Sequence, residues 1–213
     1  MRIVVKIGSS TLAHPTGRMN IRRVAELCRV LSDLKNAGHE IILVSSGAIA
    51  MGVGKLSMAS RPHVTPTKQA AASIGLCELM YTYNKEFAEY NHTVAQILLT
   101  VLDLQDEEHR KNFENTMARL LELGALPVIN ENDSVATEEL EIDNDTMGAL
   151  VAEAVGAELL ILLSDIDGLY TADPHKDPFA RLIHDVCALT PEITALGGGE
   201  GSGLGTGGMA AQL

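Results

Sequence analysis

The sequence predicts an α/β fold in which a mostly parallel sheet lies between two layers of helices. Short runs of β-branched and aliphatic residues alternate with segments of helical periodicity along most of the 213 residues. Glycine turns separate many of these segments, and the first three follow the order strand, helix, strand, which implies parallel pairing with a right-handed crossover. The hydrophobic content of 46% and the charged content of 21% suit a globular core.

The expected elements follow one another regularly. The first strand covers residues 2–7 and ends at Gly8. Asn20 is placed to cap a helix that stops near Gly38, which is a C-cap signal. Further strands are expected at residues 41–44, 94–99, 126–129 and 159–163, and further helices at 67–90, 112–123 and 146–155. The last strand is wholly aliphatic, so we expect it to be buried on both faces of the sheet.

The composition argues against some classes of binding partner. The formal net charge is -12 at pH 7, which argues against non-specific binding to nucleic acid or to a membrane surface, because both need basic patches. The negative charge does not exclude a phosphate ligand, since backbone N–H groups and a few lysines can bind one locally. The chain starts directly with a strand and no apolar stretch could span a bilayer, so we expect a cytoplasmic protein. Cys28, Cys77 and Cys187 lack metal-ligand spacing, and the first two are expected to be small core residues.

The most informative stretch contains two acidic runs. The apolar residues 126–129 lead into Asn-Glu-Asn-Asp at 130–133, and Asp-Asn-Asp follows at 143–145. Carboxylates and carboxamides desolvate badly when crowded, so a fold that gathers them usually holds a cationic ligand or a metal. Ligands in open α/β sheets collect beyond the carboxyl ends of the strands. The alternative is a solvated acidic loop on an already acidic protein.

Two further features each allow two interpretations. Lys6 is a lone charge in an apolar strand, directly before the glycine turn at residues 8–10. It is either a cation aimed at a phosphoryl group, which spreads negative charge over its oxygens during transfer, or a lysine that reaches solvent from the strand edge. The glycine-rich residues 197–208 form either a flexible tail or, near residues 205–208, a turn whose N–H groups cradle phosphate.

Taken together, the motifs resemble one family. Val-Lys-Ile-Gly-Ser-Ser at residues 5–10 looks like the opening motif of the amino acid kinase superfamily. Within it, the two acidic runs and the segments 45–50, 96–100, 168–174 and 205–209 are similar, in the same order, to the glutamate 5-kinase family. The resemblance covers nearly the whole chain. It implies one amino acid kinase domain over residues 1–213, folded as a three-layer α/β/α sandwich.

The resemblance also implies a reaction and site residues. The reaction is the phosphorylation of the γ-carboxylate of L-glutamate by ATP with Mg²⁺, the first step of proline biosynthesis. Lys6 would stabilise the transferring phosphate, and Asp145 would orient the catalytic lysines. Glutamate would contact Ser46, Gly47, Ala48, Asp133 and Asn144, and the nucleotide would contact Lys6, Ser164, Asp165, Gly205, Thr206, Gly207, Gly208 and Met209. No residue is assigned as a metal ligand, because ATP phosphates and water would hold Mg²⁺. Proline as a feedback inhibitor and a homo-oligomer are also implied.

The chain departs from the family pattern at its end. Gln212 stands at or near the position of a lysine that serves the family as a second catalytic cation, and glutamine cannot supply that charge. The sequence stops inside an expected helix, without the C-terminal RNA-binding-like (PUA) domain of many bacterial members. We therefore expect the nucleotide-binding half to be truncated at the C-terminus. Besides the enzyme, two alternatives remain: a non-catalytic fragment that binds glutamate, and a family member that acts on another small carboxylate or on a nucleotide monophosphate.

Overall fold

A parallel sheet forms the centre of the computed structural model, which describes residues 1–14, 16, 18–135, 144–174 and 176–196. The described sheet has five strands in the order β3-β4-β2-β1-β5, and every pair is parallel. The strands are β1 (Arg2–Ile7), β2 (Glu40–Ser45), β3 (Val94–Leu99), β4 (Leu126–Glu131) and β5 (Leu159–Leu163). Because all run the same way, their carboxyl ends share one edge.

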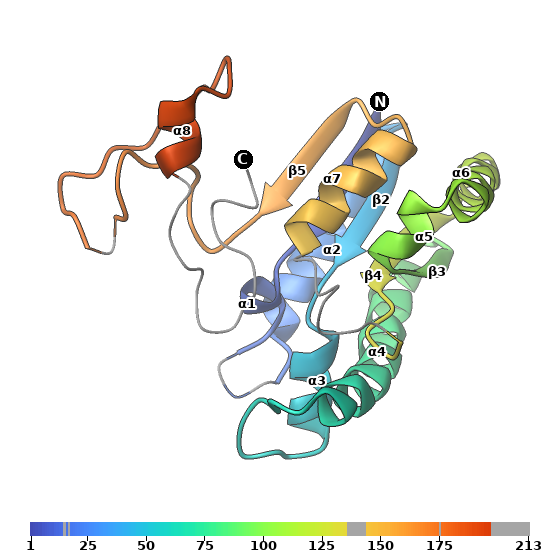
Figure 1. The fold of residues 1–213 in the computed structure, drawn as a ribbon. Coiled ribbons are helices and arrows are strands. Elements are labelled where there is room, and N and C mark those ends of the chain that lie inside the picture. Colours follow the sequence, from blue (N-terminus) through green and yellow to red (C-terminus); the bar gives the residue numbers. More distant parts are fainter. Residues whose placement is uncertain (15, 17, 136–143, 175, 197–213) are drawn as a thin grey trace.

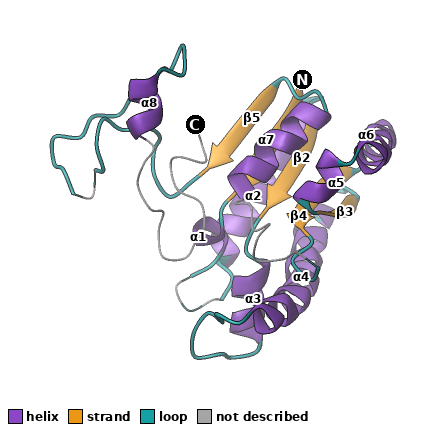
Figure 2. Cartoon of the chain, viewed as in Figure 1, coloured by secondary structure: helices purple, strands orange, loops and turns teal. Residues whose placement is uncertain are grey.

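Helices cover both faces of this sheet (Figure 1). On one face, α2 (Ile21–Asn36) and α4 (Thr65–Ala88) pack against the side chains of β1 that include Val5 and Ile7. On the other face, α5 (Val101–Gln105), α6 (Glu107–Glu122) and α7 (Asn144–Ala154) pack against the alternate residues, which include Val4. Figure 2 shows the same layering by element type. The predicted three-layer α/β/α sandwich is confirmed.

Local signals set the helix ends. The Asn20 side chain accepts a hydrogen bond from the backbone N–H of Arg23 and caps α2, as predicted. Glycines end several helices: Gly38, Gly124 and Gly156 each follow a helix, and each has a positive φ angle, which an L residue adopts only with strain. The short helices α1 (Ser9–Leu12), α3 (Ala48–Lys55) and α8 (Pro191–Leu196) were not predicted. They are too short to give a clear helical period in the sequence.

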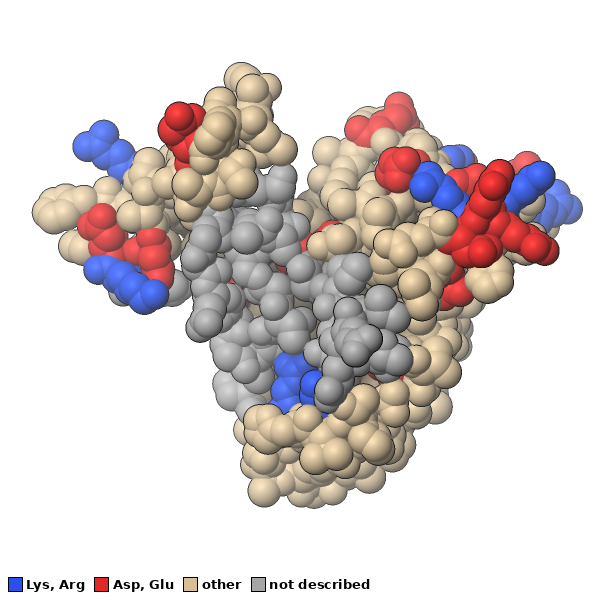
Figure 3. All heavy atoms as spheres, viewed as in Figure 1, with Lys and Arg blue, Asp and Glu red and all other residues tan. Residues whose placement is uncertain are grey.

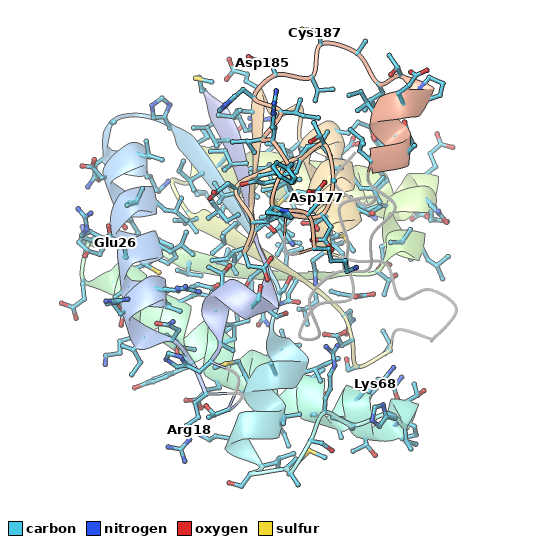
Figure 4. The ribbon with its side chains drawn as sticks, turned by 90° about the vertical axis from the view of Figure 1, so that its left-hand side faces the viewer. Arg18, Glu26, Lys68, Asp177, Asp185 and Cys187 are labelled. Atoms are coloured by element: carbon cyan, nitrogen blue, oxygen red, sulfur yellow. The ribbon has the colours of Figure 1, made fainter. Side chains whose placement is uncertain are left out.

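Two predictions about burial were wrong. Within the described sheet, β5 is an edge strand that pairs with β1 alone, so Leu159 is 40% exposed and the rest of the strand is half-buried. An aliphatic run is therefore no proof of burial on both faces. Cys28 is buried in the core as expected, whereas Cys77 is exposed on α4. Cys187 is also exposed, in the extended segment between β5 and α8 (Figure 4).

Charged side chains gather over α6 (Figure 3). Asp106 caps this helix by accepting a hydrogen bond from the backbone N–H of His109. Arg110 forms ion pairs with Glu114 on the same helix and with Glu153 on α7. Among the described residues, no helix combines the length and the apolar character needed to cross a bilayer.

Candidate active site

Loops from separate parts of the chain meet at the carboxyl edge of the sheet. The backbone N–H of Gly8, after β1, donates to the carbonyl of Leu163 on β5 at 3.3 Å. The N–H of Ser46, after β2, donates to the carbonyl of Ile7 at 3.2 Å. The N–H of Asn132, after β4, donates to the carbonyl at the end of β3 at 2.8 Å. These bonds hold the predicted site loops side by side, where open α/β sheets bind ligands.

Lys6 is a buried cation at this edge. It lies on the α7 face of β1 and is only 7% exposed, so the alternative of a solvent-reaching lysine is wrong. Its ammonium forms an ion pair with the carboxylate of Asp145, in the first turn of α7. One turn further on, a Cβ at Gly148 would lie 3.2 Å from the Cβ of Lys6. The absence of a side chain at Gly148 therefore lets α7 close onto the lysine stem.

Gly8 keeps the space beside the ammonium open. A Cβ built on this glycine would lie 3.6 Å from Nζ of Lys6, and 3.8 Å from Oγ of Ser10. Any side chain at position 8 would thus touch the ammonium and occupy the space from which an anion could approach it. Gly8 therefore keeps open the space that an anion would need to reach the ammonium of Lys6.

The loop after β2 is a tight glycine turn. Ser46 is buried, and Gly47 has a φ of +98°, a left-handed conformation that favours glycine. Ala48 begins α3 directly after it. Sequence reasoning predicted the loop and its glycine, but not the helix that follows.

Two amide side chains at this edge each have a buried polar atom without a hydrogen-bond partner among the described residues. Asn130 is 3% exposed, and its Nδ2 finds no hydrogen-bond partner among the described residues. Asn144, the first residue of α7, has a buried Oδ1 that also lacks a partner within the described part of the chain. Such groups are rare in native proteins unless they await a ligand or water. Asn130 was part of the predicted acidic run, but no role was assigned to it; the signal was a polar residue at the end of a buried apolar strand.

The remaining predicted residues are placed less tightly. Asp133 is half-buried in the turn after β4, where the Ser134 hydroxyl donates to Oδ1 of Asn132 at 2.6 Å. Ser164 follows β5, and its hydroxyl donates to Oδ1 of Asp165 at 3.4 Å. The other residues of interest, namely Asp143, Gly205, Thr206, Gly207, Gly208, Met209 and Gln212, lie outside the described residues. Within the described ranges, no group of three or more His, Cys, Asp or Glu side chains could hold a metal ion.

Comparisons with known proteins establish the family of this chain. Residues 1–213 match the family model described as the amino acid kinase family, and the chain belongs to that family. The chain is 47% identical to the glutamate 5-kinase of Clostridium perfringens, over all of this chain and 81% of that relative. It is 50% identical to the glutamate 5-kinase of Listeria innocua, over all of this chain and 79% of the relative. Within the amino acid kinases, the chain therefore belongs with the glutamate 5-kinases.

These relatives are longer than this chain, to different extents. The glutamate 5-kinase of Carboxydothermus hydrogenoformans is 50% identical over the whole chain, which spans 58% of that relative.

Proposed function

We propose that this chain transfers the terminal phosphoryl group of ATP to the γ-carboxylate of L-glutamate, giving L-glutamyl 5-phosphate. The observation that supports this most strongly is the buried ion pair of Lys6 and Asp145 at the carboxyl edge of the sheet. A cation held in place by a carboxylate can neutralise the charge that the transferring phosphoryl group spreads over its oxygens. Glutamate is the proposed acceptor because the relatives at about half identity are glutamate 5-kinases.

Catalysis would rest on positioning and charge neutralisation. The γ-carboxylate oxygen attacks the terminal phosphorus in line, while the bond from phosphorus to the bridging oxygen of ADP breaks, and no covalent enzyme intermediate forms. Lys6 contacts the phosphoryl oxygens in the space that Gly8 leaves open, and Asp145 holds the ammonium there. We propose that Mg²⁺ arrives with the nucleotide rather than in a cage of protein side chains. Bound Mg²⁺ would neutralise phosphate charge through the ATP oxygens and water.

The unmet amide groups match the two charged ends of an amino acid. Oδ1 of Asn144 would accept a hydrogen bond from the α-ammonium of glutamate, and the carboxylate of Asp133 would attract the same ammonium. Nδ2 of Asn130 would donate to a substrate carboxylate. The loop of residues 46–48 would complete the pocket for glutamate. Each of these two buried atoms would then gain the partner that it lacks among the described residues.

The nucleotide would lie beside β5. Ser164 and Asp165 follow this strand directly, and the Gly8 turn is hydrogen-bonded to it. We also propose that the glycine turn of residues 205–209 contributes backbone N–H groups to the phosphates. Inhibition by proline and self-association complete the proposal, and are tested by adding proline to the assay and by measuring the molar mass in solution.

The first experiment measures ADP release from ATP and Mg²⁺ by this chain with L-glutamate, N-acetylglutamate or UMP as the acceptor. We expect release with L-glutamate alone, because N-acetylglutamate lacks the ammonium that Asp133 and Asn144 would bind, and the acidic run would repel UMP. Release with another acceptor but not with L-glutamate would refute the proposed substrate.

A variant tests the amino-acid site separately. Asp133→Ala should raise the KM for glutamate about tenfold to a hundredfold, the range expected for the loss of a hydrogen bond to a charged group. The KM for ATP should change little. Asp106→Ala is the matched control: Asp106 caps α6 and has no proposed contact with either substrate, so both KM values should stay unchanged. An equal effect of Asp133→Ala on both substrates would contradict its assignment to the glutamate site.

A further inference from the structure

The loop that begins at Ser46 is supported on its core side by a buried hydroxyl of α4. Tyr83 is fully buried, and its hydroxyl lies 2.9 Å from Oγ of Ser45. The Ser45 hydroxyl donates to the carbonyl oxygen of Ser46 at 3.2 Å. Since a serine hydroxyl has one hydrogen, Tyr83 must be the donor to Ser45. Burial raises the pKa of Tyr83 above its ordinary value, so the phenol keeps the proton that it donates.

The same helix also touches the other side of the loop. A Cβ built on Gly75 of α4 would lie 1.8 Å from the carbonyl oxygen of Ala48, so the backbones of α3 and α4 are in direct contact there. Gly52 of α3 is equally close to the carbonyl oxygen of Ala71. The α4 helix therefore reaches the Ser46 carbonyl through the hydroxyl of Ser45, and contacts the Ala48 carbonyl directly by close packing.

The direction of the Ser46 carbonyl has a consequence for the site. This carbonyl and the N–H of Gly47 belong to one peptide unit, which is trans, because the described chain contains no cis peptide bond. The two groups point in opposite directions. A carbonyl held toward Ser45 thus turns the Gly47 N–H away from the core.

We propose that Tyr83 is a positioning residue for the glutamate site, which acts through Ser45 to fix the peptide between Ser46 and Gly47. The identity of the ligand rests on the proposed function, whereas the orientation of the loop does not. Tyr83 touches no substrate. Its contribution is to keep the loop in its binding conformation before glutamate arrives, which lowers the ordering cost of binding.

Four variants test this assignment by calorimetric measurement of L-glutamate and ATP binding. Tyr83→Phe keeps the ring and removes the hydroxyl, so the Kd for glutamate should rise about threefold to tenfold, as for the loss of one buried hydrogen bond. Ser45→Ala should have a similar effect. Because both act through one chain of hydrogen bonds, the double variant should be little weaker than either single variant. The Kd for ATP should not change in any of them.

The matched control is Phe87→Leu. Phe87 lies one turn along α4 in the same core, stacked on Tyr83 with ring centroids 6.3 Å apart, and is also fully buried. This change should lower the melting temperature without changing the Kd for glutamate. If Phe87→Leu weakens glutamate binding as much as Tyr83→Phe does, or if the double variant is fully additive, the role of Tyr83 is only structural and the inference is overturned.

Amide hydrogen exchange gives a second reading that needs no ligand. The segment of residues 46–51 includes the N–H of Met51, which donates to the carbonyl of Gly47 at 2.9 Å. Tyr83→Phe should speed exchange in this segment relative to α6, and Phe87→Leu should not. If the wild-type chain binds no glutamate, the proposed function fails, and the exchange result alone decides whether Tyr83 positions the loop. Unchanged exchange in Tyr83→Phe overturns the inference.

Discussion

Replacement of Lys6 should destabilise the protein as well as stop phosphoryl transfer. The side chains of Lys6 and Asp145 are 9% and 5% exposed, so removal of the ammonium leaves a carboxylate with little access to water. Breaking a buried ion pair by removing one partner costs about 3–5 kcal/mol. A domain of this size loses about 2–4 °C of melting temperature per kcal/mol. Lys6→Met should therefore lower the Tm by about 6–20 °C, measured by calorimetry or circular dichroism.

A double variant separates the loss of stability from the loss of chemistry. Lys6→Met together with Asp145→Leu removes both charges and fills their space with apolar groups, a change that is often neutral or stabilising. Its Tm should return to within a few degrees of the wild-type value, whereas ADP release should stay absent. Lys55→Met is the control, because Lys55 forms an exposed ion pair with Glu78 that contributes little to stability.

Three results would refute this reasoning. A Lys6→Met variant that melts like the wild type would show that the Asp145 carboxylate finds another partner or water when the ammonium is removed. A double variant as unstable as the single one would show that charge burial is not the cause. ADP release by the stable double variant would remove Lys6 from the mechanism.

Two further predictions concern stability. Gly75→Ala should lower the free energy of unfolding by about 1–3 kcal/mol or more, because its Cβ would lie 1.8 Å from the carbonyl oxygen of Ala48, and a urea midpoint equal to that of wild type would contradict this contact. The second prediction concerns Asp103. Burial raises its pKa, but hydrogen bonds from Thr100 and His109 outweigh this effect and lower the pKa below its ordinary 3.8. Its contribution is therefore complete above that ordinary value and is lost as the pH falls through the lower folded-state pKa. Asp103→Asn weakens the capping box that Asp103 forms with Thr100 and should cost about 0.5–1 kcal/mol at pH 7. The difference from wild type in urea unfolding should close as the pH falls through the lowered pKa; a constant difference would count against the carboxylate.

Local signals in the sequence were enough to place most of the elements. The cap at Asn20 and the positive φ of Gly38 depend only on neighbouring residues, so both ends of α2 could be predicted within a residue or two. The helix α3 could not, because its backbone depends on contact with α4 through Gly52 and Gly75, which lie far apart in the sequence. Helical periodicity does not reveal a contact between two backbones.

Residue patterns alone predicted the separate loops of the candidate site, but not the ion pair between Lys6 and Asp145. A glycine turn after an apolar strand and an acidic run after another are visible in the sequence, and parallel topology brings them to one edge. Whether Lys6 reaches solvent or is buried depends on α7, which contributes Asp145 and the close approach of Gly148. The edge position of β5 in the described sheet depends on the order of the strands, which its own composition does not specify.

Lys6 and the loop at Ser46 are held by opposite layers of the sandwich. Lys6 pairs across the sheet with Val44, one residue before Ser45, so the two site elements are neighbours on adjacent strands. Because side chains alternate, Lys6 faces α7, where Asp145 holds it, whereas Ser45 faces α4, where Tyr83 holds it. Changes at Asp145 should therefore act on the transferring phosphoryl group, and changes at Tyr83 on the amino acid. The alternation of side chains along β1 and β2 lets one edge of the sheet hold Lys6 from the α7 side and the loop at Ser46 from the α4 side.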